Sequence, residues 1–176
     1  MNGFPSSGLE SERVGIADFK VSNDPQGVLH SGWLGAGLGV TAYDSAARVG
    51  GLLHAPLAEP GPHEKTSRLR PALFVDTGLT ALLQAVARLG ADPARLVICL
   101  VGGARLASRP PGPDPGHDKF STAIRALARH QLTPQAQHLT ASSDCRCSLM
   151  LATGEVCLRF SGQTGVMVLW KSSTAT

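Results

Sequence analysis

Several features are scarce in this chain, and each scarcity excludes a class of protein. Aromatic residues make up 5% of the 176 residues and charged residues 16%. The net charge is only +3, and no stripe of lysine and arginine is interleaved with aromatics, so nucleic acid is not expected as a partner. No apolar run approaches the roughly 20 residues that a membrane-spanning helix needs. The chain is therefore not expected to be embedded in a membrane.

Cysteine is sparse as well, and its pattern bears on compartment and on metal binding. The four copies are Cys99, Cys145, Cys147 and Cys157, whereas a secreted disulfide scaffold is shorter and denser in cysteine. The N-terminal text MNGFPSSGLESERVG carries acids where a secretory signal needs a basic start and an apolar stretch. A cytoplasmic protein with reduced thiols is expected. No second ligand pair accompanies Cys145 and Cys147 at a zinc-like spacing, so neither a metal nor a cofactor is predicted.

What the chain does contain is enough apolar text for one sizeable core, with 43% hydrophobic residues. Residues 1–12 are small and polar and are predicted to be a flexible N-terminal tail. Residues 13–171 are predicted to form a single domain. Strand-like and helix-like segments alternate along it, which indicates an α+β or mixed α/β fold.

The individual elements follow from periodicity and turn residues. Strands are predicted at Arg13–Val21, in short pieces between Val28 and Pro60, at Arg95–Val101, and near Cys147–Leu151, Glu155–Phe160 and Val166–Trp170. Helices are predicted at Asp76–Leu89, with Asp76 as its N-terminal cap and Gly90 as its end, and at about Lys119–Arg129, with Ala123, Ile124, Leu127 and Ala128 on its apolar face. The glycines between Gly32 and Gly39 predict a tight loop between strands, Thr153-Gly154 a hairpin turn, Gly61–Pro71 a polar linker, and Ser108–Gly116 an exposed loop.

One segment combines residues that can carry chemistry. Ser31, a run of glycines and His54 lie on short elements separated by tight turns. Glycines there allow backbone N–H groups to converge on an anion or a developing oxyanion, and a nearby histidine can serve as a general base. Taken alone the signal is weak, because a single histidine between Leu53 and Ala55 is more often a packed core residue.

The text LGAGLGVTAYDSAARVGGLLHAPLAEP resembles the CheD family of chemoreceptor glutamine deamidases. In that family T-x-G-x-G-S-C-V-G-V leads to an aspartate and then to G-G-x-x-H. By this resemblance Ser31 matches the family threonine, Gly37 the nucleophilic cysteine and His54 the catalytic histidine. Weaker matches run in the same order through most of the chain: Val14–Asp18, Asp44, Gly50-Gly51, Phe74–Thr77, Gly102–Ala104 and Thr153-Gly154. The fold that the resemblance implies is a sandwich of mixed β-sheets with helices packed on one side.

The departures from the family pattern bear directly on activity. CheD-type enzymes attack a glutamine side-chain amide with a cysteine thiolate that a histidine activates, and they hydrolyse the resulting thioester. Gly37 has no side chain to form that thioester, and loss of the nucleophile in a serine protease costs roughly a millionfold in turnover. The family's G-G-N segment is replaced by Ser142-Ser143-Asp144. Trp33 stands where the family has a small residue, and it either covers the cleft or packs on the rim of the loop.

Two substitutes for the missing thiol are conceivable. Cys99 is predicted in a buried strand, where thiols are inert, while Cys145 and Cys147 stand near the replaced G-G-N segment. Ser31 has a hydroxyl, but the family uses that position for support rather than attack. Neither substitute is favoured by the sequence.

Two classes of function follow from the resemblance. In the first, the protein is an impaired protein-glutamine deamidase that acts on the cytoplasmic helices of chemoreceptors with residual activity through His54 and Ser31. In the second, it is a non-catalytic binding module that docks on chemoreceptors or on a CheC-like phosphatase. An unrelated adaptor that kept only the scaffold is a third alternative.

Overall fold

The structure is a computed structural model that describes residues 10–61, 64–103, 115–140 and 143–172. Its strands form two five-stranded sheets. Sheet A has the order β1 (Ser11–Val14), β3 (Val28–Ser31), β8 (Cys145–Met150), β9 (Val156–Phe160) and β10 (Met167–Trp170); sheet B has the order β2 (Asp18–Ser22), β5 (Val49–Ala55), β4 (Leu38–Asp44), β6 (Val97–Gly102) and β7 (Ala136–Leu139). The helices are α1 (Glu64–Leu69), α2 (Val75–Arg88) and α3 (Pro115–Arg129).

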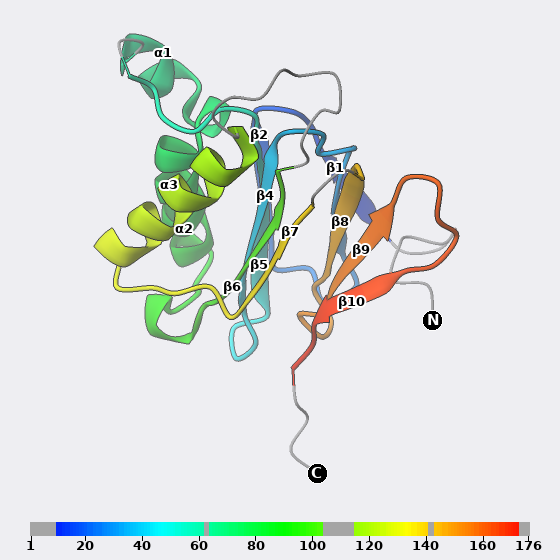
Figure 1. Cartoon of the computed structure of the whole chain (residues 1–176). Coiled ribbons are helices and arrows are strands. Elements are labelled where there is room, and N and C mark those ends of the chain that lie inside the picture. Colours follow the sequence, from blue (N-terminus) through cyan, green and yellow to red (C-terminus); the bar gives the residue numbers. More distant parts are fainter. Residues whose placement is uncertain (1–9, 62–63, 104–114, 141–142, 173–176) are drawn as a thin grey trace.

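Both sheets are mixed, and they pack face to face with helices on the far side of one of them. The β1–β3 and β6–β7 pairs are parallel and the other pairs are antiparallel. Helices α2 and α3 cover one face of sheet B, and the opposite face of sheet B packs on sheet A (Figure 1). The predicted α+β sandwich with helices on one side is confirmed.

Strands β4 and β5 lie in the middle layer, and their sequence shows it. All seven residues of each are buried, because one face packs on helices and the other on sheet A, so both faces call for apolar or small side chains. Thr41 and Asp44 of β4 and His54 of β5 are the buried polar or charged exceptions. Arg95 donates to both carboxylate oxygens of Asp44 at 2.8 and 3.2 Å, and this pairing lowers the Asp44 pKa to about 2.

The N-terminal part of the fold differs from the predicted single strand at Arg13–Val21. A turn at Gly15–Ala17, with Ala17 at φ 56°, divides this text into β1 in sheet A and β2 in sheet B. Alternating apolar residues cannot reveal that two halves of one run join different sheets. Ser11 and Glu12, placed in the tail by the sequence, belong to β1, and residues 1–9 lie outside the described residues.

Helix α2 agrees with its predicted bounds, but its predicted start is wrong in one respect. The N-cap is Phe74, and no side chain caps the helix. Asp76 lies within the first turn and pairs instead with Arg129 of α3. Gly90 ends the helix with φ 104°, as predicted. The polar linker at Gly61–Pro71 contains the short helix α1, and the predicted strand at Arg95–Val101 begins two residues later, after a 3-10 turn at Pro93–Arg95.

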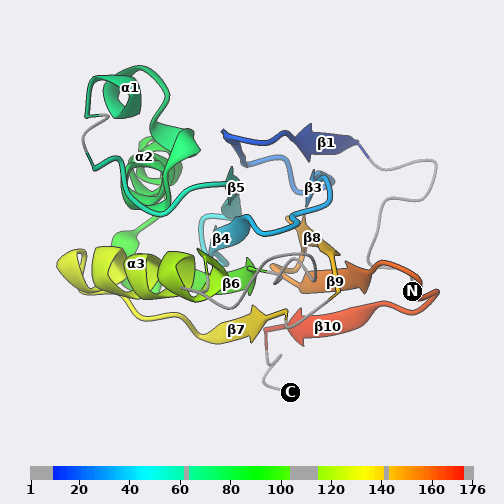
Figure 2. The same ribbon diagram turned by 45° about the horizontal axis from the view of Figure 1, so that its top comes forward.

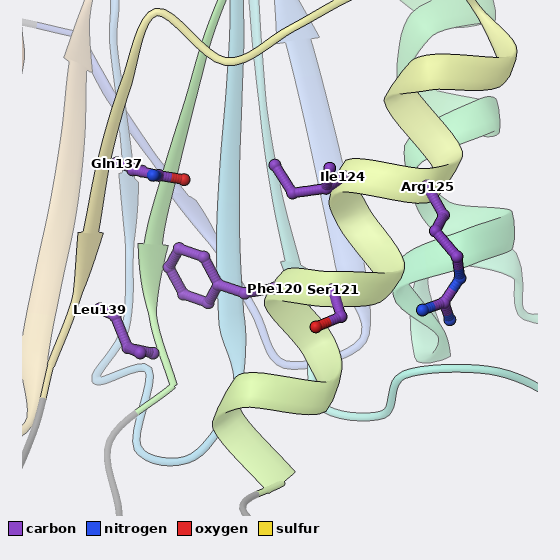
Figure 3. Close-up of a pocket in the computed structure, with 6 residues that line it drawn as sticks. All are labelled: Phe120, Ser121, Ile124, Arg125, Gln137 and Leu139. Carbon is purple, nitrogen blue, oxygen red and sulfur yellow. The ribbon is translucent and has the colours of Figure 1, made fainter.

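Helix α3 begins earlier than predicted, and its predicted apolar face is confirmed in part, since Ala123 and Leu127 are buried. Phe120 and Ala126 are buried, whereas Ile124 is 41% exposed and Ala128 is exposed. Ile124 instead borders a hollow of about 610 Å³ between α3 and β7, with Phe120 and Leu139 also lining it (Figure 3). Pro115 and Gly116, predicted as the end of an exposed loop, begin α3; the rest of that loop, 108–114, lies outside the described residues.

The strand-rich end is close to expectation, with β8, β9 and β10 near the predicted positions. Gly154 completes the turn between β8 and β9, with φ 73° and its N–H donating to Met150 O at 2.7 Å. Strand β7 was missed, because AQHL is short and carries two polar residues. Its inward residue His138 packs edge-on against Phe160 of β9, which closes one side of the sandwich beside β10 (Figure 2).

Candidate functional site

The loop at 32–37 carries the chain from β3 in sheet A to β4 in sheet B, and backbone bonds from both sheets hold it. Leu34 N–H donates to Cys145 O of β8 at 2.9 Å, and Gly103 N–H, just beyond β6, donates to Gly37 O at 2.8 Å. Within the loop, Gly37 N–H donates to Leu34 O at 2.7 Å. The predicted tight loop is therefore confirmed, although Leu38 and Gly39 already belong to β4.

His54 lies on β5, where its backbone pairs with Gly39 of β4 and Asp18 of β2. Its side chain is only 1% exposed, and Nδ1 has no hydrogen-bond partner among the described residues. Burial lowers the pKa of this imidazole, while a hydrogen bond with the Leu34 backbone and the charge of Asp144 act in the opposite direction. The ring is therefore neutral near pH 7 and shielded from solvent.

Gly37 and His54, which are 17 positions apart in sequence by their numbers, are neighbours in the structure. A Cβ built on Gly37 would lie 2.8 Å from His54 Nε2 and 2.8 Å from Leu34 O. Both distances are shorter than real Cβ contacts, so the imidazole and the turn occupy the space where a side chain would begin. The structure thus brings together the two positions that the sequence matched to nucleophile and base, with no nucleophile present.

A second glycine is needed beside the first for a different reason. Gly102 ends β6 at φ 112°, a conformation that side chains disfavour, and a Cβ there would lie 2.6 Å from Gly37 O. The Gly102-Gly103 turn therefore lets the end of β6 approach the loop closely enough for the Gly103–Gly37 hydrogen bond. The glycines on both sides of this contact have packing roles.

Ser31 has a structural partner for each of its hydrogen-bonding functions. Its hydroxyl is buried, donates to Gly32 O at 2.7 Å and accepts the Cys147 N–H at 3.0 Å. It thereby joins the end of β3 to β8. Neither bond reaches His54 or Gly37, so Ser31 shapes the base of the loop instead of pointing a reactive oxygen at the imidazole.

Asp144 is a site residue whose position the sequence did not reveal. Its carboxylate accepts the Gly35 N–H at 2.6 Å across 109 sequence positions, and its charge acts on the His54 imidazole. Gly35 has φ 54°, and this turn points its N–H to the carboxylate. In the sequence, the indication that Asp144 belongs to the site was its position near the place of the family's G-G-N segment.

All four cysteines are buried, and burial raises the pKa of each thiol. The pKa rises to about 11 for Cys99 and to about 12 for Cys145 and Cys157, and the pKa of Cys147 is also raised. A thiol with such a pKa is almost fully protonated near neutrality and is a poor nucleophile. No group of three or more His, Cys, Asp or Glu side chains in the described residues gathers as metal ligands would.

Trp33 packs at the rim of the loop, against Arg146. Its ring stacks on the guanidinium of Arg146, with 4.3 Å from the Arg146 Cζ to the ring centroid, and the residue is 39% exposed. Of the two interpretations of Trp33, the structure therefore favours packing on the rim.

The fold and the residues of the site point to one class of protein, and comparison with known proteins identifies that class. The profile of the CheD family, described as chemotactic sensory transduction, matches residues 57–160. The chain belongs to the CheD family.

The individual relatives carry one shared description. A protein from Pyrococcus abyssi is 36% identical over 84% of this chain and 90% of its own length, and one from Pyrococcus horikoshii is 35% identical over 86% and 93%. A protein from Desulforamulus reducens is 42% identical over 54% of this chain and 56% of its own length. All three are described as probable chemoreceptor glutamine deamidases. None of the helices in the described ranges has the length and apolar character that a membrane span requires.

Proposed function

We propose that this protein is a non-catalytic member of the CheD family that acts in chemotaxis by binding the cytoplasmic helices of chemoreceptors. The observation that carries the proposal is the contact between Gly37 and His54. The imidazole stands beside position 37, but that position carries no atom able to attack an amide. A thioester cannot form there, whatever the surrounding groups do.

Three further observations support a binding role over residual deamidation. His54 is 1% exposed, so an amide has no open path to the imidazole in this conformation. Ser31 uses its hydroxyl between Gly32 and Cys147. The cysteines are buried with raised pKa values. Neither Ser31 nor the cysteines therefore provide a ready substitute nucleophile, while the described strands hold the loop between the two sheets.

The receptor is proposed as the partner because the relatives are described as chemoreceptor glutamine deamidases. A domain that keeps the scaffold but loses the nucleophile can still occupy a receptor and thereby block or report its modification state. A CheC-like phosphatase is the alternative partner that the family resemblance suggests. Occupancy, rather than turnover, is the proposed mode of action.

The test is to incubate the whole chain with a chemoreceptor cytoplasmic fragment and to follow both binding and ammonia release. We expect a complex by sedimentation or calorimetry, with no increase in receptor mass from conversion of glutamine to glutamate. Glutamate formation that disappears in His54→Ala would show that the protein is an enzyme. Failure to bind the fragment would remove the receptor from the proposal, and a parallel experiment with a CheC-like phosphatase would decide the alternative.

A further inference from the structure

The outer face of sheet A, opposite to the helices, is rich in arginine. Successive side chains of a strand point to opposite faces of the sheet. In sheet A, Leu29, Cys147 and Leu158 point inward to the core. The residues that precede and follow each of them along its strand therefore point away from sheet B. The outward side chains include Arg13 of β1, His30 of β3, Arg146 of β8 and Arg159 of β9. All described helices lie on the other side of sheet B (Figures 1 and 2).

Three of these side chains lie close to one another across the sheet. Arg146 and Arg159 are direct partners in the β8–β9 register. Arg13 reaches over the start of the loop, where its Nη2 would lie 3.1 Å from a Cβ on Gly32. The register of β3 with β8, continued by two residues, sets Gly32 opposite Arg146.

Arg146 is also held in place by the loop that carries Gly37. The Trp33 ring stacks on its guanidinium, and its Nε is buried without a hydrogen-bond partner in the described residues. Such stacking leaves the in-plane N–H groups of a guanidinium directed at other ligands. Arg13 and Arg146 form no ion pair with a described acidic side chain. Two acids stand near this row: Asp144, two residues before Arg146, accepts the Gly35 N–H, and the carboxylate of Glu155 meets the Cys157 thiol.

We propose that this arginine face, defined by Arg13, Arg146 and Trp33, binds an acidic segment of a protein partner through its carboxylates. Guanidinium groups pair with carboxylates in a two-point geometry, and Trp33, 39% exposed, adds an apolar contact for the methylene groups of a glutamate. A net charge of only +3 gives too weak a field for a polyanion such as nucleic acid to be the favoured ligand.

The identity of that partner as a chemoreceptor rests on the proposed function. Trp33 of the arginine face and Gly37 belong to one loop, at 32–37, so a segment seated on Trp33 contacts the loop that carries position 37. The reaction named for the relatives, deamidation of a chemoreceptor glutamine, yields a glutamate. Because arginines favour carboxylates over amides, we infer that this protein prefers the glutamate form of the receptor.

The experiment compares Arg13→Glu and Arg146→Glu with a matched charge reversal, Arg88→Glu, at the exposed end of α2 on the other side of the molecule. Circular dichroism and thermal unfolding verify that each variant is folded, and Arg13, which is exposed, keeps the test valid if Arg146→Glu fails to fold. The probes are a receptor cytoplasmic fragment in its all-glutamate and all-glutamine forms, a glutamate-rich helical peptide with its glutamine counterpart, and a DNA oligonucleotide.

We expect the glutamate forms to bind more tightly than the glutamine forms, and each reversal in the arginine face to weaken binding about tenfold. Arg88→Glu should leave binding unchanged, and added salt should weaken the wild-type complex. Receptor binding that is equally insensitive to all three reversals would refute the arginine face and leave the proposed function standing. Arginine-dependent binding of the acidic peptide without receptor binding would support the arginine face and refute the proposed function. Loss of both, or arginine-dependent binding of the oligonucleotide alone, would overturn the inference.

Discussion

His54 Nε2 lies within 2.8 Å of the point where a side chain on Gly37 would begin. Position 37 and the imidazole are therefore adjacent, and the imidazole and the Leu34 carbonyl occupy the volume that a side chain at position 37 would take. The packing around position 37 thus matches the glycine that the sequence has there.

The first prediction concerns that packing. Gly37→Ala and Gly37→Cys both add a Cβ that meets His54 Nε2 and Leu34 O at 2.8 Å, and we expect each to lower the free energy of unfolding by about 1–3 kcal/mol. Urea denaturation measures the change. Equal losses in the two variants would assign the cost to the Cβ, and an unchanged free energy of unfolding in Gly37→Ala would show that the loop has room there.

The same pair separates sterics from chemistry. Only Gly37→Cys places a thiol beside the imidazole, so we expect any amide hydrolysis on a receptor fragment to appear in Gly37→Cys and never in Gly37→Ala. Hydrolysis by Gly37→Ala at the level of Gly37→Cys would mean that a group other than position 37 performs the attack.

Ser31 provides the second prediction. Ser31→Ala leaves the buried Cys147 N–H without its acceptor at 3.0 Å, which should lower the free energy of unfolding by about 1–3 kcal/mol. Ser31→Thr keeps the hydroxyl and is the matched control, with a much smaller expected change. If Ser31→Ala left stability intact but reduced receptor binding, the hydroxyl would have a direct functional role that its two bonds do not indicate.

The third prediction concerns pH. Burial lowers the His54 pKa below its ordinary value of 6.5, so the unfolded chain takes up a proton on acidification that the folded chain resists. This linkage removes stability as the pH falls below about 6.5, by up to about 1.4 kcal/mol per pH unit. In the His54→Gln variant, the free energy of unfolding should not fall with pH in this way. Unfolding free energies measured between about pH 7 and pH 5 for both proteins give the difference, and parallel curves would mean that His54 titrates normally in the folded state.

The fourth prediction concerns the thiols. All four cysteines are buried with raised pKa values, so iodoacetamide should modify none of them at an appreciable rate in the folded protein near neutral pH. All four should react once urea unfolds the chain. Mass spectrometry counts the adducts. Rapid alkylation of Cys145 in the folded state would reopen the possibility that this thiol, two strand positions before Cys147, acts at the loop.

Much of the fold could be predicted from the sequence, because the residue pattern within each element indicates its type. The apolar spacing of Leu79, Leu82 and Val86 fixed α2, and the continuous apolar text of β4 and β5 reflects burial on both faces. Prediction from the sequence failed where contacts between residues far apart in the chain decide the structure. The run at 13–21 reads as one strand, yet it is divided between two sheets, and Ile124 reads as core, yet α3 is rotated so that Phe120 takes that place.

The candidate site divides in the same way. The order of Ser31, Gly37 and His54, and the lack of a side chain at position 37, are properties of the sequence, and they predicted the family and suggested the proposal of a non-catalytic protein. Tertiary structure alone decided that His54 is buried against Gly37, that Ser31 bonds to β8, that Asp144 caps Gly35 from 109 positions away, and that arginines from three strands share one face. The physical reason is that covalent capacity belongs to a residue, whereas burial, pKa and charge proximity belong to the neighbours that folding assembles around it.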